Sequence, residues 1–333
     1  MRAPRFWRTD GVAARCLAPL GWVYAGLGWA RWAVHRPAAV PVPVFCVGNA
    51  TVGGSGKTPI VLDLLARLQR QGIVPFALCR GHGGRSREPV QVDPARHDAM
   101  AVGDEALLLA RAAPTIAARD RLAGARLAVA AGADAIVLDD GMQYPRLAKS
   151  WTLLVVDGPT GFGNGRIVPA GPLREPAGRA SARADAVVVV GDGLAPTVLS
   201  AFAGPTWRCR LSPAEEAPAL AGKRVVAFAG IGRPEKFFAT VAAMGGTIVA
   251  REAFADHHPF TDQELAALAR TAKDARAQLV TTAKDAARLP GRFTDRVLVV
   301  PVGVDWDDPA RVDRALASVI TTFDPTAVGP RSH

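Results

Sequence analysis

Short apolar runs alternate with amphipathic segments along most of the chain. Residues 42–47 form the first run and lead into a glycine-rich turn. In the following segment, 59–71, Ile60, Leu64 and Leu68 recur at helical spacing, which predicts a helix with one buried face. Further strands are expected at 73–78, 135–138, 152–156, 186–190, 225–229, 247–249, 279–282 and 296–300. Further helices are expected at 103–113, 117–131, 234–244, 262–275 and 309–322. This alternation predicts an α/β fold with a mainly parallel sheet flanked by helices.

Changes in composition indicate where the chain divides. The stretch 212–222 is rich in Pro, Ala and Glu and is expected to be a linker. Strand–helix alternation resumes after it, which predicts a second, smaller α/β lobe. The expected divisions are an N-terminal interfacial segment at 1–40, a larger lobe at 41–211, the linker at 212–222, the smaller lobe at 223–322 and a disordered tail at 323–333.

A phosphate-binding loop is predicted between the first strand and the first helix. Residues 44–58 read Val-Phe-Cys-Val-Gly-Asn-Ala-Thr-Val-Gly-Gly-Ser-Gly-Lys-Thr, an apolar strand followed by a glycine-rich turn and Gly-Lys-Thr. In a P-loop, backbone N–H groups wrap nucleotide phosphates, the lysine reaches the β/γ-phosphates and the next hydroxyl holds Mg²⁺. The larger lobe is therefore expected to be P-loop NTPase-like. The residues expected to bind the nucleotide are Thr51, Val52, Gly53, Gly54, Ser55, Gly56, Lys57 and Thr58.

One position departs from the strict P-loop pattern. Thr51 stands five residues before Gly56, where a glycine usually lets the loop turn sharply. Gly53 and Gly54 can supply that freedom, because glycine adopts positive φ at little cost. An ordinary glycine-rich turn between a strand and a helix is the alternative interpretation.

Carboxylates occur at the ends of predicted elements. Asp139 and Asp140 end an apolar strand, the position at which a Walker-B acid helps to hold Mg²⁺, and an ordinary Asp-Asp-Gly turn is the alternative. Asp104 and Glu105 open a predicted helix. Negative charge at a helix N-terminus is favourable by about 0.3–1 kcal/mol, so these two acids have a purely structural interpretation as well. Their functional interpretation is a base or a metal partner near the phosphates.

A pair of histidines lies in a predicted loop of the second lobe. His257 and His258 are two of the six histidines of the chain, and they follow Asp256 directly. A neighbouring carboxylate can orient a histidine and favour its charged form, which suits acid–base chemistry. Two surface histidines without a function are the alternative interpretation.

The overall composition describes a protein with a sizeable core. The chain has 333 residues, of which 49% are hydrophobic, enough for one large or two smaller α/β domains. The cysteines form no Cys-x-x-Cys pair, which argues against a zinc site or a disulfide framework; they are Cys16, Cys46, Cys79 and Cys209. The net charge of +10 suits nucleic acid, an anionic membrane surface or a phosphorylated substrate. An arginine-rich composition with no specific partner is the alternative.

The first 36 residues concentrate positive charge and tryptophan. Six arginines there accompany a single acid, Asp10, and four of the seven tryptophans occur in the same stretch. The apolar run 16–30 is shorter than the roughly 20 residues that span a bilayer, and it contains Pro19 and three glycines, which weaken a helix. Arginines at both ends, with aromatic residues, fit a segment lying in the lipid headgroup region. A helical hairpin packed on the domain and a cleaved signal peptide are the alternatives.

Together these motifs resemble those of the tetraacyldisaccharide 4′-kinase family, the lipid A 4′-kinases of Gram-negative bacteria. The resemblance covers about residues 10 to 305. The matching stretches are 48–59, 80–84, 103–105, 139–143, 157–158, 161–165, 169–175, 256–258 and 281–285. The resemblance implies that ATP gives its γ-phosphoryl group to the 4′-hydroxyl of a tetraacylated, 1-phosphorylated glucosamine disaccharide, with lipid IVA as the product.

The resemblance also implies roles for individual residues, with ATP and Mg²⁺ as cofactors. Asp104 is the implied base, supported by His257 from the second lobe. The implied catalytic residues are Lys57, Asp104, Asp139, Asp140 and His257. The candidate metal ligands are Thr58, Glu105, Asp139 and Asp140. The candidates for substrate contacts are Arg80, Gln143, Arg174 and Glu175, for which loop packing is the alternative.

The expected location is the cytoplasmic face of the inner membrane, with peripheral or monotopic attachment through the N-terminal segment. The lipid substrate and the anionic membrane surface are the expected partners, and a monomer is expected. No nucleic-acid partner is expected, because the basic residues cluster beside tryptophans and an apolar run instead of in a groove-binding motif.

A P-loop GTPase or an ATP-driven assembly factor at the membrane is the alternative function. GTPases typically carry Asn-Lys-x-Asp, and this sequence contains no Asn-Lys pair.

Overall fold

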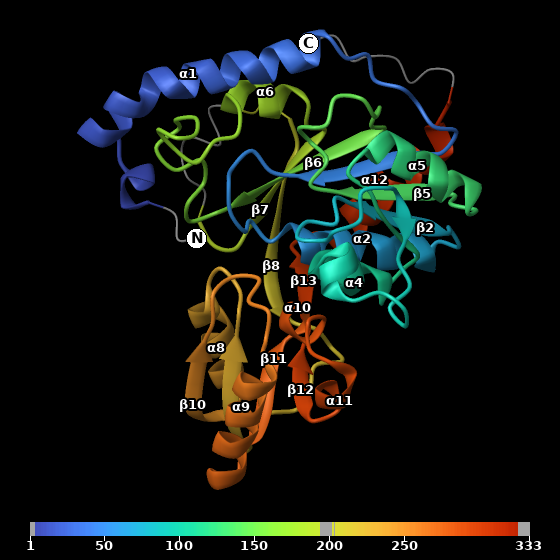
Figure 1. Ribbon diagram of the computed structural model, residues 1–333. Coiled ribbons are helices and arrows are strands. Elements are labelled where there is room, and N and C mark those ends of the chain that lie inside the picture. Colours follow the sequence, from blue (N-terminus) through green and yellow to red (C-terminus); the bar gives the residue numbers. More distant parts are fainter. Residues whose placement is uncertain (1–3, 194–201, 203, 326–333) are drawn as a thin grey trace.

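Two lobes, each built around its own sheet, make up the protein (Figure 1). The computed structural model describes residues 4–193, 202 and 204–325. Within these residues, the larger lobe holds a nine-stranded sheet and the smaller lobe a four-stranded sheet. Both lobes have the α/β architecture that the sequence pattern predicts.

The larger sheet is mainly parallel. Its strands, in spatial order, are β13 (Val302–Trp306), β8 (Thr206–Pro213), β7 (Ala186–Val190), β6 (Trp151–Asp157), β1 (Val44–Gly48), β5 (Ala135–Asp139), β2 (Pro75–Cys79), β4 (Thr115–Ala117) and β3 (Val90–Gln91). Among the described strands, only the two edge strands, β13 and β3, pair antiparallel with their neighbours. The central strands β1 and β5 are buried along their whole length, as expected for a parallel sheet covered on both faces.

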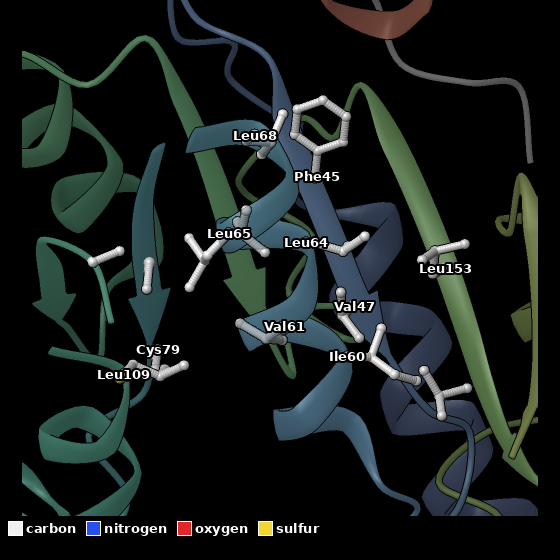
Figure 2. Close-up of a cluster of buried hydrophobic side chains, with 14 of the residues drawn as sticks. Phe45, Val47, Ile60, Val61, Leu64, Leu65, Leu68, Cys79, Leu109 and Leu153 are labelled. Atoms are coloured by element: carbon white, nitrogen blue, oxygen red, sulfur yellow. The ribbon is translucent and has the colours of Figure 1, made fainter. Parts of the chain in front are cut away.

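Helices cover both faces of the larger sheet. Helices α2 (Lys57–Arg70), α4 (Asp104–Ala110) and α12 (Pro309–Thr322) cover one face, and α5 (Arg121–Ala130) and α6 (Ala177–Ala182) cover the other. Figure 2 shows the stripe of α2 that faces the sheet, where Leu64 and Leu68 lie close to Phe45 and Val47 of β1. Burying one such leucine stabilises the fold by about 1.5–3 kcal/mol. This packing holds α2 against β1, with the loop 49–56 between them.

The smaller lobe repeats this plan with four parallel strands. In spatial order they are β10 (Thr247–Ala253), β9 (Arg224–Ala229), β11 (Gln278–Thr282) and β12 (Val297–Val300). Helix α8 (Pro234–Ala243) packs on one face, and α9 (Asp262–Asp274) and α11 (Gly291–Thr294) pack on the other. The short helix α10 (Ala283–Ala286) follows β11 and points toward the larger lobe (Figure 1).

The end of the chain returns to the larger lobe, so the expected range of 223–322 for the smaller lobe extends too far. Strand β13 pairs with β8 from Val302 opposite Pro213 to Trp306 opposite Cys209. The following helix, α12, buries its apolar stripe in the core of the larger lobe. Strand β8 also runs through the first two residues of the expected linker, 212–222. Of the expected tail, 323–333, residues 326–333 lie outside the described residues.

The predictions for residues 117–131 and 80–101 also differ from the structure. The predicted helix at 117–131 begins only at Arg121, because Asp120 accepts hydrogen bonds from the first backbone N–H groups of α5 and the preceding residues 115–117 form β4. The long loop expected at 80–101 contains β3 and the short helix α3 (Ala99–Val102). In both cases an element of two to four residues escapes a pattern search that depends on longer periodic segments.

The described part of the N-terminal segment contains one α-helix, so the alternative of a helical hairpin is wrong. A short turn of 3₁₀-helix, η1 (Arg5–Arg8), precedes α1 (Val12–Ala33), which continues through Pro19 and its glycines. Small residues of α1 face the protein, namely Ala14, Ala18 and Gly21. Large apolar residues face away from it, namely Val12, Leu20, Trp22, Val23, Leu27 and Trp29. Within the described ranges, the structure contains no helix with the length and apolar character needed to cross a membrane.

Candidate active site

The predicted phosphate-binding loop connects β1 to α2. Lys57 is the first residue of α2, and its Nζ donates to Oδ1 of the buried Asn49 at 3.1 Å and lies 3.6 Å from Asp140 Oδ1. Gly56, directly before it, has a φ of 82°, a conformation that favours glycine. The backbone N–H groups at the start of this 14-residue helix have no intrahelical partners, which makes the position suited to an anion.

Thr51 occupies the place of the first P-loop glycine because this part of the loop is extended. It forms an antiparallel bridge with Leu173, and Val52 donates its N–H to the Pro172 carbonyl at 2.8 Å. Arg174 donates its N–H to the Ala50 carbonyl at 2.7 Å. A residue in such a pairing does not need positive φ. The sharp turn lies further along, at Gly53, with a φ of 114°, as the sequence suggested.

Asp139 and Asp140 lie at the carboxyl end of β5, next to the loop. Asp139 is opposite Val47 of β1, is buried, and its Oδ1 has no hydrogen-bond partner. Burial raises the pKa of Asp139 to about 7, and the charges of Glu105 and Asp140 add to the effect. Burial also acts on Asp140, but Lys57 and Arg174 outweigh it and lower the pKa of Asp140. The pKa values of the two neighbouring carboxyl groups are therefore shifted in opposite directions.

The side chains at this edge fit a magnesium ion that is held mainly by a nucleotide. Oxygen ligands suit Mg²⁺, and the unpartnered Asp139 Oδ1 is a buried carboxylate oxygen beside the loop. Thr58, the second residue of α2, provides a hydroxyl at the same edge. In the part of the chain that the structure describes, no three His, Cys, Asp or Glu side chains gather as a metal cluster. Mg²⁺ commonly uses one or two carboxylates together with phosphate oxygens and waters, so no such cluster is required.

A second group of charged residues joins the two lobes at the start of α4. Asp104 is 4% exposed, and its Oδ2 lies 2.9 Å from Nδ1 of His257, a residue of the smaller lobe. Its Oδ1 accepts the N–H of Glu105 at 2.9 Å. Burial raises the pKa of Asp104, but the hydrogen bond with His257 and the charges around it outweigh burial and leave that pKa lowered. The same hydrogen bond raises the pKa of His257.

Two basic residues of the smaller lobe, Lys284 and Arg288, complete this group. Lys284 Nζ lies 3.3 Å from Glu105 Oε1 and 3.2 Å from His257 Nε2. Arg288 Nη1 lies 3.4 Å from Asp104 Oδ2. Both arise from the turn around α10, where the Thr282 hydroxyl accepts from the N–H of Asp285, as in a helix N-cap. The sequence signal for this turn was present at 281–285, but it did not assign a role to either cation.

The backbone holds His257 in an unusual conformation. Its φ is 59°, and its N–H donates to the Gly230 carbonyl at 3.1 Å. The buried Asp285 accepts the Gly230 N–H at 3.0 Å and also contacts Arg288. A positive φ is uncommon for a residue with a side chain, so this framework holds His257 against a local cost. His258, the neighbouring residue, instead contacts Glu264 at 2.9 Å within its own lobe.

Three of the four predicted substrate residues form one chain beside the P-loop. Gln143 Nε2 donates to the Asn49 carbonyl and to Glu175 Oε1, each at 2.9 Å. Arg174 Nη1 donates to Asp140 Oδ2 at 2.9 Å. Arg80 is separate from this chain, exposed directly after β2. The structure thus brings Lys57, Asp139, Asp140, Gln143, Arg174 and Glu175 together, and joins Asp104, Glu105 and His257 in the neighbouring interlobe group.

Comparisons with known proteins agree on one family. The sequence matches the family model described as Tetraacyldisaccharide-1-P 4′-kinase over residues 13–321. A tetraacyldisaccharide 4′-kinase of Rhodospirillum centenum is 52% identical over 331 residues, covering 97% of this chain and 98% of the relative. A tetraacyldisaccharide 4′-kinase of Rhodospirillum rubrum is 50% identical over 328 residues, covering 95% of this chain and 98% of the relative.

A solved structure has the same fold. It is the "apo" form of LpxK from Aquifex aeolicus in complex with ATP, which is 25% identical in sequence with a TM-score of 0.74. The match covers 92% of this chain and 99% of that one, so it includes both lobes. With the family match and the curated relatives, it shows that the chain belongs to the tetraacyldisaccharide-1-phosphate 4′-kinase family.

Proposed function

We propose that the protein transfers the γ-phosphoryl group of ATP to the 4′-hydroxyl of a tetraacylated glucosamine disaccharide 1-phosphate. The bond between the β,γ-bridging oxygen and the γ-phosphorus breaks, a bond from the sugar oxygen forms, and ADP, lipid IVA and a proton are released. The observation that carries the proposal is the position of the Asp104–His257 pair next to an edge that holds Lys57 and the Asp139–Asp140 pair. Membership of the kinase family supports the same reaction.

The P-loop side of the site binds the nucleotide in this proposal. The N–H groups of residues 53–56 and of the start of α2 surround the phosphates, since the Val52 N–H is already bonded to the Pro172 carbonyl. Lys57 leaves Asn49 and Asp140 to neutralise the β/γ oxygens. Thr58 and Asp139 would hold Mg²⁺, with Asp140 and Glu105 as further candidates. When bound, the ion neutralises charge on the β- and γ-phosphates.

Asp104 serves as the base in this proposal. Its lowered pKa keeps the carboxylate ionised at neutral pH, so it can accept the proton of the 4′-hydroxyl. His257 holds the carboxylate in place through the hydrogen bond at 2.9 Å and, when charged, favours its ionised form. Because His257 belongs to the smaller lobe, the base is correctly oriented only when the two lobes are together.

The candidate contacts for the sugar and its 1-phosphate are the polar side chains beside the P-loop. Arg174, Gln143 and Glu175 offer a cation, an amide and a carboxylate within hydrogen-bonding distance of one another. Arg80, exposed after β2, provides a second guanidinium, and arginine suits bidentate binding of phosphate. These four residues stay candidates for the substrate contacts.

Membrane attachment through α1 is part of the proposed function. Trp22, Leu27 and Trp29 of this helix are 71%, 69% and 57% exposed, and arginines flank the apolar run. Such a helix suits the headgroup region of an anionic bilayer. We therefore propose a monomer attached to the cytoplasmic face of the inner membrane, where the acyl chains of the substrate remain in the lipid.

The test is incubation of the purified protein with γ-³²P-ATP, Mg²⁺ and the 1-phosphorylated tetraacyl disaccharide in mixed micelles. The expected result is a doubly phosphorylated lipid that carries the label, with ADP formed in equal amount. Label released only as inorganic phosphate would contradict the proposal. Preferential hydrolysis of GTP without lipid labelling would favour the alternative of a GTPase or assembly factor.

A further inference from the structure

Helix α1 rests on the loop that carries two of the candidate substrate residues. Arg166 of this loop forms an ion pair with Asp10, just before α1, at 2.5 Å. Gly21, in the middle of α1, lies so close to the loop that a Cβ there would be 3.0 Å from the Ile167 carbonyl oxygen. The loop then continues into Leu173 and Arg174, which pair with the P-loop backbone. The lipid-facing helix and the phosphate-binding loop therefore share one supporting segment.

The other end of α1 contacts two basic residues near the site through the ring of Trp32. Trp32, in the last turn, is partly buried, and the guanidinium carbon of Arg183 lies 4.5 Å from the centre of its ring. The Nζ of Lys149 lies 5.4 Å from the same centre. Arg183 is the C-cap residue of helix α6, over which α1 passes in Figure 1. A cation over the face of an indole is attracted to it, most strongly where water is excluded.

Arg183 also contacts one of the candidate substrate residues. It forms an ion pair with Glu175, and both side chains are only 12% exposed. Glu175 accepts the same Gln143 amide that binds the Asn49 carbonyl. Asn49 in turn accepts from Lys57, the central cation of the P-loop. A continuous series of contacts thus leads from the membrane helix to the nucleotide site.

We infer that Trp32 is a positioning residue, which aligns Glu175 and Gln143 with the P-loop by holding Arg183 in place. This inference rests on the proposed function, because it assigns the residues being aligned to that reaction. Without the ring, Arg183 loses its cover and can turn toward solvent. Glu175 is then no longer fixed, and the Gln143 amide loses one of its two acceptors. In this inference the helix does more than attach the protein to the membrane. Its contacts with the loop and with Arg183 also set the geometry of the site.

The test separates alignment from membrane attachment with two tryptophans of the same helix. Trp32→Leu keeps an apolar side chain but removes the π face, and Trp32→Phe restores a face. Trp22→Leu is the matched control, because Trp22 is 71% exposed and has no place in the series of contacts. The measurements are kcat and KM in mixed micelles, the Kd of Mg-ATP by calorimetry, and sedimentation with anionic vesicles.

Trp32→Leu is expected to lower kcat and weaken Mg-ATP binding, each by between about 2-fold and 30-fold, with vesicle sedimentation unchanged. Trp32→Phe is expected to recover most of the loss. Trp22→Leu is expected to show the opposite pattern, with weaker sedimentation and an unchanged Kd for Mg-ATP. Trp32→Leu with wild-type kcat and Kd, or with losses that Trp32→Phe does not recover, would overturn the inference.

Failure of the proposed function would give a different result. Wild-type protein that binds Mg-ATP but leaves the disaccharide unlabelled would refute the kinase reaction, while the Kd of the Trp32 variants would still decide the inference. A further check uses the pair Trp32→Leu and Arg183→Lys. If the ring acts through Arg183, the double variant should bind Mg-ATP no more weakly than the worse single variant. Losses that simply add would show that the ring acts by another route.

Discussion

Helix α2 turns its large apolar side chains toward the protein, whereas helix α1 turns them away from it. Helix α2 buries Ile60, Leu64 and Leu68 against the sheet (Figure 2). Its residues Gln69 and Arg70 are exposed. Helix α1 places Ala14 and Gly21 against the protein and its large apolar side chains outward. In water, an apolar stripe normally faces the core. The reversed arrangement of α1, with its flanking arginines, is the basis of the proposed contact with a lipid surface.

The difference teaches that the two helices depend on different surroundings. Helix α2 is fixed by the core of the larger lobe, and so are the P-loop and Lys57 at its start. Helix α1 is held by a narrow stripe of small residues and a few polar contacts, so its apolar surface is left for another partner. Substitutions in the two helices should therefore affect different properties of the protein.

The largest contrast is expected in stability. Leu64→Ala leaves a cavity under α2 and should lower the free energy of unfolding by about 2–5 kcal/mol. Leu27→Ala, the matched change in α1, removes a side chain that is 69% exposed and should shift it by no more than about 0.5 kcal/mol in detergent-free buffer. Denaturant titration measures both. Equal losses would mean that α1 is packed as a core helix.

The next contrast concerns catalysis. Lys57→Ala removes the ammonium group at the start of α2, and turnover should fall by about 10²–10³-fold, since a fixed charge is lost from the transferring phosphates. Single-turnover assays with saturating Mg-ATP measure the rate. Vesicle sedimentation of this variant should equal that of the wild type. Turnover within tenfold of wild type would remove Lys57 from the proposed role.

A smaller effect is expected for the outward tryptophans of α1. Replacing Trp22 and Trp29 together by Ser removes two large side chains from the proposed lipid contact, and partitioning onto anionic vesicles should fall by at least about tenfold. The free energy of unfolding should change little, because both side chains are exposed in the protein. Unchanged partitioning would remove the membrane role of this face.

The smallest expected effect is a pH dependence of the active site that membrane binding by α1 does not share. The pKa of His257 is raised above its ordinary value of about 6.5 by Asp104, so its charge is present below that pH and is lost as the pH rises through the raised pKa. The stabilising ion pair with Asp104 is lost over the same pH range. The value of kcat should therefore decline a few-fold as the pH rises through the pKa of His257. His257→Gln should lack this decline. Vesicle binding should not change over this range, because the arginines around α1 remain charged.

Much of the larger lobe could be predicted because its segments are long and periodic. The strand 44–48 and the helix 57–70 carry apolar patterns that match their burial, and the glycines between them identify the turn. Strand β13 escaped prediction, because its partner β8 is 89 residues earlier by the register of Val302 opposite Pro213. The chain returns to the larger lobe because β13 pairs with the distant β8 and α12 packs into the core of that lobe.

The candidate site was predicted in part for a related reason. The P-loop and the acids at the end of β5 are local motifs, and Asp104 and His257 were paired only through the family resemblance, because 153 residues separate them. Lys284 and Arg288 depend on the way the two lobes meet, which no local pattern encodes. Likewise, the outward face of α1 was visible in the sequence as apolar residues, but their direction was not.

The most direct measurement of the proposed chemistry compares wild-type protein with Asp104→Ala in a single turnover. Both are loaded with Mg-ATP, mixed with the tetraacyl disaccharide 1-phosphate, and the labelled lipid is followed with time. Loss of the base is expected to slow lipid labelling by about 10²–10⁴-fold, while the Kd of Mg-ATP stays within about twofold of wild type. Labelling at a near-normal rate in the Asp104→Ala protein would contradict the proposed role of the interlobe pair.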